Sequence, residues 1–88
     1  MPFDSSYYVS LYTFFKNATE RWPRSVTWDH QGPVVVHGSK HVLRDAEILA
    51  SEIAAKHGGL SQAIVDRTLQ DGRPAIVVDY KPVAPSNV

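Results

Sequence analysis

The side chains best able to do chemistry gather in the middle of the chain, where His37 and His41 stand four residues apart. Asp29 and His30 precede them, and imidazole and carboxylate groups are both ligands that Zn²⁺ accepts. Two histidines at this spacing bind a metal well when they share one helical turn. The Gly-Ser pair between them instead indicates a helix start, which favours histidines in a solvated loop. A His-based metal site is therefore the second hypothesis here.

A serine between the two histidines raises the possibility of nucleophilic catalysis. Ser39, His37 and Asp29 have the residue types of a hydrolase triad. No Gly-x-Ser-x-Gly turn surrounds the serine, so we interpret it as the cap of the helix that follows. The remaining aspartates fall in a turn or alternate with apolar residues, and no acid–base pair is indicated. The sequence predicts a protein that is not an enzyme and has no cofactor.

The composition limits the class of partner. The chain has 88 residues, of which 43% are hydrophobic and 20% charged, and this fits one small globular domain. Nine basic and nine acidic residues cancel, so nucleic acid is a disfavoured partner. Cysteine is absent, which removes disulfides and thiolate sites. The first residues do not resemble a signal peptide, and no apolar run reaches the roughly 20 residues of a membrane span. We expect a cytoplasmic protein with no membrane contact.

Two helices are predicted from apolar residues that recur every three or four positions. The first spans residues 4–22 and ends before Pro23, because a proline pushes the preceding residue out of the helical region. The second is capped by Ser39 and runs to His57, where Gly58 provides a left-handed stop.

Strands are predicted around the second helix. Residues 25–37 contain two β-branched runs that flank a turn, in which Gly32 is expected to supply a positive φ. Residues 63–69 form either a strand or a short helix, and their β-branched side chains favour the strand. On that interpretation residues 70–73 are a second turn and residues 75–80 the returning strand.

The order α-β-β-α-β-β predicts a two-layer α+β fold, with an antiparallel four-stranded sheet of two hairpins and two helices on one face. We expect a single domain over residues 1–80 and a loose tail over residues 81–88. The small size, the lack of cysteine and this layout resemble those of many phage and mobile-element proteins, including anti-CRISPR inhibitors. The resemblance implies an alternative function, an inhibitor that binds a host protein complex, and it extends to no individual residue.

Aromatic residues are concentrated in the first predicted helix. One stripe contains Tyr7, Leu11, Phe14, Ala18 and Trp22, and a second, one residue along, contains Tyr8, Tyr12 and Phe15. Together they form an apolar arc wider than the roughly 100° of a one-sided surface helix. Either the domain covers the arc as core, or part of it stays exposed for a partner. We predict a protein–protein interaction domain that self-associates as a homodimer through Tyr8, Tyr12, Phe15, Phe3 and Trp22.

Overall fold

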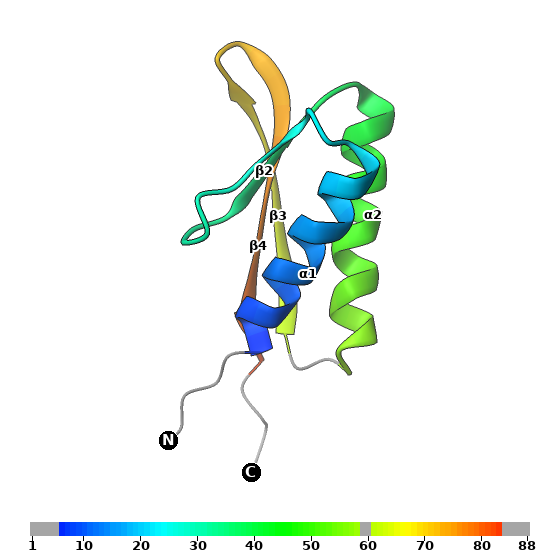
Figure 1. The fold of residues 1–88 in the computed structure, drawn as a ribbon, viewed down its shortest axis with the longest axis vertical. Helices are drawn as coiled ribbons and strands as arrows, with labels where there is room; N and C mark the ends of the chain where they lie inside the picture. Colours follow the sequence, from blue (N-terminus) through cyan, green and yellow to red (C-terminus); the bar gives the residue numbers. More distant parts are fainter. Residues whose placement is uncertain (1–5, 59–60, 84–88) are drawn as a thin grey trace.

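The computed structural model describes residues 6–58 and 61–83. Within these residues the elements are α1 (Ser6–Arg21), β1 (Val26–Thr27), β2 (Val34–His37), α2 (Lys40–Lys56), β3 (Ser61–Gln70) and β4 (Arg73–Pro82). The predicted α+β fold is confirmed, since the element order is α-β-β-α-β-β and the four strands form one antiparallel sheet. Both helices cover the same face of that sheet (Figure 1).

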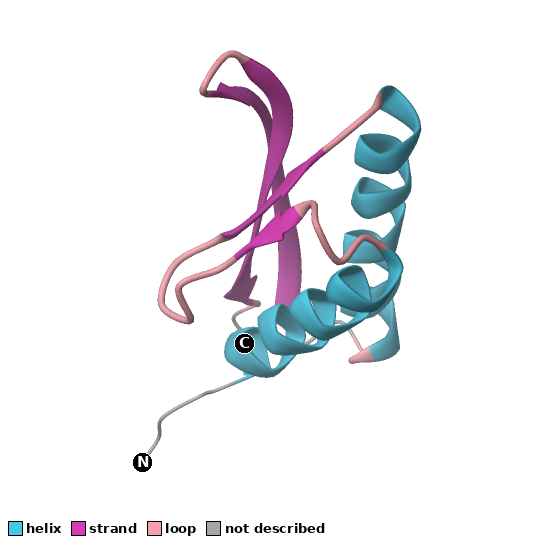
Figure 2. Ribbon diagram, turned by 45° about the horizontal axis from the view of Figure 1, so that its top comes forward, coloured by secondary structure: helices cyan, strands magenta, loops and turns pink. Residues whose placement is uncertain are grey.

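The strand order β1-β2-β4-β3 places β4 inside the sheet, between the second strand of the first hairpin and the first strand of its own hairpin. β4 pairs with β3 over ten residues and with β2 over four. Each helix and the hairpin that follows it therefore form one half of the fold. The two halves meet where β2 pairs with β4. Figure 2 shows both helices on one side of the twisted sheet, with the β1–β2 connection projecting beside α1.

The core lies between the helices and the sheet. Alternate residues of β2 and β4 point inward, and the antiparallel register sets Val34 opposite Val78 and Val36 opposite Ile76. The helices bury residues at three- and four-residue intervals against these strands. The helical core residues are Leu11, Phe14, Ala18, Leu43, Ala46, Leu49, Ala50 and Ile53.

A buried tyrosine connects the sheet to the second helix. The hydroxyl of Tyr80 in β4 donates a hydrogen bond of 2.6 Å to the carbonyl oxygen of Ala50 in α2. Burial raises the pKa of the Tyr80 hydroxyl, so this group stays protonated and remains a donor. The contact satisfies a polar group inside the core, where an unpaired hydroxyl would be costly.

Several predicted boundaries shift in the structure. Residues 61–70 form the strand β3, so the strand interpretation is confirmed over the helix alternative. β1 contains only two residues, Val26 and Thr27, of the first predicted β-branched run. β4 continues through Pro82, two residues beyond the expected domain boundary at residue 80. Neither described helix is long and apolar enough to cross a membrane.

The prediction for Gly32 was wrong, because the left-handed residue of the first hairpin is His30, with φ +69°. By contrast, Gly58 and Gly72 do have positive φ, at +70° and +77°. Ser39 caps α2 as predicted, and its hydroxyl accepts a hydrogen bond of 3.3 Å from the backbone N–H of Val42.

Candidate functional site

Five rings gather where α1 meets the β1–β2 connection, and we call this group the aromatic cluster. Trp28 is at its centre, directly after β1. Its ring centroid lies 4.9 Å from Phe15, 6.0 Å from Tyr8 and 6.2 Å from Tyr12. His30 stacks on the indole at 4.4 Å. These separations and tilted orientations are those of favourable aromatic pairs, so the cluster joins helix and hairpin.

The β1–β2 connection positions Trp28 through its own hydrogen bonds. The indole Nε1–H of Trp28 donates to the carbonyl oxygen of Gly32 at 2.7 Å. Asp29 Oδ1 accepts from the backbone N–H groups of Gln31 at 2.9 Å and Gly32 at 3.0 Å. These backbone hydrogen bonds, led by that from Gly32, lower the pKa of the Asp29 carboxyl. The turn thus presents the rings of Trp28 and His30 to α1.

The aromatic cluster has a buried base and an exposed rim. Trp28 is buried in the hydrophobic core, and Phe15 is partly buried against it. Tyr8 and Tyr12, one helical turn apart on α1, are 42% and 46% exposed. Val9 beside them is also exposed. The result is an apolar surface whose tyrosine rings rest on a fixed indole and still contact solvent.

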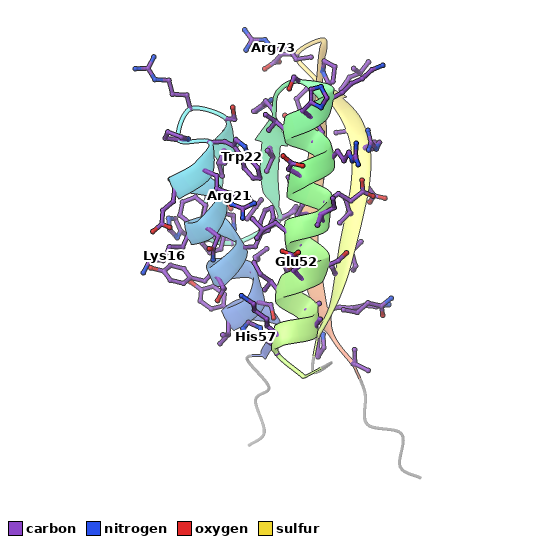
Figure 3. The ribbon with its side chains drawn as sticks, turned by 90° about the vertical axis from the view of Figure 1, so that its right-hand side faces the viewer. Lys16, Arg21, Trp22, Glu52, His57 and Arg73 are labelled. Atoms are coloured by element: carbon purple, nitrogen blue, oxygen red, sulfur yellow. The ribbon has the colours of Figure 1, made fainter. Side chains whose placement is uncertain are left out.

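The predicted interface residues are only partly brought together. Tyr8, Tyr12 and Phe15 all contact Trp28. Trp22 is partly buried against the core at the other end of α1, and Figure 3 shows it at the opposite end of the helical layer from His57. Phe3 lies outside the described residues.

Sequence reasoning missed Trp28 and His30, which were assigned only to the hairpin and to a hypothetical metal site. Trp28 and His30 reach α1 through contacts between residues 13 to 20 positions apart, and α-helical spacing carries no information about such contacts. A usable signal was the tryptophan itself, placed next to the predicted turn of the first hairpin. A large ring in that position needs a partner from another element.

The side chains proposed for metal binding do not form a ligand set. His30 belongs to the aromatic cluster, whereas His37 is at the far end of β2. Over residues 6–58 and 61–83, no three histidine, aspartate or glutamate side chains lie close enough together to hold a metal ion. Ser39 is engaged as the cap of α2.

A different serine–histidine contact, which the sequence did not predict, lies at the other end of α2. Ser10 Oγ is 2.7 Å from His57 Nδ1 and 2.6 Å from Ser61 Oγ. Ser10 is 0% exposed and Ser61 only 3%, so both hydroxyls are buried. The three side chains come from α1, the end of α2 and the start of β3, and we interpret the network as a structural connection between them.

Of these groups, the aromatic cluster is the one that combines a fixed framework with rings exposed to solvent. Comparisons of this chain with known protein families, curated proteins and solved structures found no match. The function is therefore inferred from the geometry and the charges of the molecule.

Proposed function

We propose that this protein is a non-enzymatic interaction domain that forms a symmetric homodimer through the aromatic cluster. The observation that carries the proposal is the exposure of Tyr8 and Tyr12, at 42% and 46%, although both rings pack on the indole of Trp28. Such rings lose little further conformational entropy on binding, because the contact with Trp28 already restricts them. Tyrosine also contributes a large area while its hydroxyl stays at the wet rim of an interface.

The charge balance supports a second copy of the chain as the occupant. The formal net charge is zero, so two copies approach without long-range repulsion. In a two-fold interface the same surface contributes from both sides, and Tyr8 and Tyr12 of one copy would pack against those of the other. Symmetric dimers are the commonest soluble oligomers. The proposal includes a cytoplasmic location, since small secreted domains are more often held together by disulfides and this chain has no cysteine.

Light scattering coupled to size exclusion tests this proposal directly. The wild-type chain is expected to elute as a dimer that dissociates on dilution, and the Tyr8→Asp/Tyr12→Asp double variant as a monomer. The two new carboxylates would lose hydration at the interface and repel their copies in the partner. Ile48→Asp is the matched control, because Ile48 is an apolar side chain of α2 with a similar exposure of 47%. It should leave the dimer intact.

Two results would contradict the homodimer. One is a wild-type chain that stays monomeric up to about 1 mM, where even a millimolar Kd becomes visible. The other is equal dissociation by the tyrosine variant and by Ile48→Asp, which would place the contact elsewhere. Far-UV circular dichroism of each variant establishes that loss of the dimer is not loss of the fold.

A further inference from the structure

A pocket of about 310 Å³ lies at the end of β2 away from the β1–β2 connection, and the aromatic cluster takes no part in it. It forms where the α1–β1 connection, the end of β2 and the start of β4 come together. Figure 1 shows these three segments in the upper half of the view. The lining residues are Arg24, Ser25, His37, Gly38, Arg73 and Pro74. Two of the six are arginines, and no acidic residue lines the pocket.

The positive charge of this pocket is not neutralised by the described carboxylates. Arg24 and Arg73 are both exposed. Across the described part of the chain the single ion pair joins Arg67 to Glu47, at 3.1 Å. Asp71 is only two residues from Arg73 in the sequence and forms no ion pair with it. A neutral molecule therefore carries a local excess of positive charge, at the end where Figure 3 shows Arg73.

His37 contributes a further polar group to the pocket, in addition to the two arginines. Its Nδ1 atom is buried and has no hydrogen-bond partner among the described residues. A buried polar atom without a partner is uncommon in folded proteins, and it is costly unless a ligand or water satisfies it. The backbone N–H of His37 donates to the carbonyl oxygen of Ser25 at 2.8 Å, which holds two walls of the pocket together.

The backbone at Gly38 keeps the pocket in place. Gly38 has φ +148°, and an added Cβ would lie 2.9 Å from the Cβ of Val42 in α2. The chain therefore turns from β2 into α2 at a position that accepts only glycine without adjustment. This turn fixes the distance between His37 and the first turn of α2.

We propose that this pocket binds a small oxyanion, the doubly charged phosphate group that free phosphate and phosphate monoesters share. A guanidinium group presents two parallel N–H donors that match two oxygens of a phosphate, and two arginines can balance its double negative charge. His37 lines the same pocket and adds a polar ring beside the two guanidinium groups. The recognition is local, so it requires no excess of basic residues over the whole chain.

Titration with inorganic phosphate, followed by amide resonances in nuclear magnetic resonance at constant ionic strength, tests the proposal. Saturable shifts are expected at Ser25, His37, Gly38 and Arg73, and the same concentration of chloride should produce none. The Arg24→Gln/Arg73→Gln variant should bind at least about tenfold more weakly, because charge-assisted hydrogen bonds are lost. The control Arg44→Gln, an exposed arginine of α2 outside the pocket, should stay within about twofold of the wild type.

Further ligands distinguish the source of the phosphate group. O-phosphoserine and adenosine monophosphate are titrated beside inorganic phosphate, and tighter binding of one of them identifies a peptide-linked or a nucleotide phosphate. Equal affinities for all three identify free phosphate. The Arg24→Lys/Arg73→Lys variant keeps both charges but loses the paired donors, so its affinity should fall between those of the wild type and the glutamine variant.

The proposal is overturned if the shifts do not saturate, if they fall outside the pocket, or if the glutamine variant binds phosphate as the wild type does. Circular dichroism confirms that the variants are folded. Phosphate binding by the Tyr8→Asp/Tyr12→Asp variant should be unchanged, because neither tyrosine lines the pocket. This variant therefore tests phosphate binding independently of the homodimer.

Discussion

Backbone conformation at single residues decides how the two hairpins turn. In the β3–β4 hairpin, Asp71 and Gly72 have φ +54° and +77°, and the flanking Gln70 and Arg73 are paired. Two consecutive left-handed residues between paired strands are the geometry of a tight type I′ turn. In the β1–β2 connection the left-handed conformation falls on His30, whose ring stacks on Trp28. Both hairpins therefore reverse the chain through left-handed residues, but the residue types that take this conformation differ.

A pair of glycine variants tests this difference. Gly72→Ala should lower the free energy of unfolding by about 1 kcal/mol, because a side chain is disfavoured at φ +77°. No atom lies within 4 Å of the position of the added Cβ, so the cost comes from the backbone alone. Gly32→Ala is the control, since it also meets no atom and has no positive φ, and it should change stability by less than about 0.5 kcal/mol. Urea unfolding measures both, and equal losses would contradict the assignment.

At the scale of elements, the connection between β1 and β2 matters more than the short strands themselves. β1 contributes only two residues to the sheet, yet the segment after it carries Trp28 and His30 to α1. The carboxylate of Asp29 accepts hydrogen bonds there from two backbone N–H groups. The aromatic cluster thus depends on a turn that contains a titratable group.

The free energy of unfolding should depend on pH through Asp29 in this turn. The pKa of Asp29 in the folded chain is below its ordinary value of 3.8, so the folded state holds fewer protons than the unfolded state in acid. The contribution of Asp29 to the free energy of unfolding is fully present above its ordinary pKa of 3.8. It is lost as the pH falls through the lower pKa that Asp29 has in the folded chain. Asp29→Asn keeps an oxygen acceptor without a charge and should flatten the stability curve below about pH 4. Urea midpoints between about pH 6 and pH 2.5 measure this, and parallel curves would contradict it.

The elements themselves were largely predictable from the sequence, whereas the contacts between them were not. Repeats of three and four residues located both helices, and the β-branched Ile64, Val65 and Thr68 identified β3. These signals depend on neighbours along the chain. The aromatic cluster and the pocket bring together residues that are far apart in the sequence, such as Arg24 and Arg73, so the sequence pattern does not predict their contact. The exposure of Tyr8 and its contact with Trp28 were both visible only in the structure.

For the whole molecule, the balance of nine basic and nine acidic residues affects how copies of the chain meet. Long-range electrostatic forces between copies are small when the net charge is zero. The proposed interface consists of aromatic rings and carries its affinity through apolar burial, which salt screening does not weaken.

Salt should therefore separate the two proposed sites. The Kd of the homodimer is expected to change by less than about threefold between about 50 and 300 mM NaCl, whereas phosphate affinity should fall clearly over that range. Dilution series by light scattering and phosphate titrations at both salt concentrations give the two values. A steep loss of the dimer in salt would indicate that charged pairs, and not the aromatic cluster, hold the copies together.

The seam between β2 and β4 gives the chain a natural point of division. No strand of one helix–hairpin unit is inserted between the two strands of the other, and Gly38 lies on the only connection between the units. Cleavage of the backbone at Gly38 would leave both hairpins and both helices intact. The two fragments would still bury Val36 against Ile76 and share the same core, so a nicked chain should behave as a noncovalent complex of two complementary pieces.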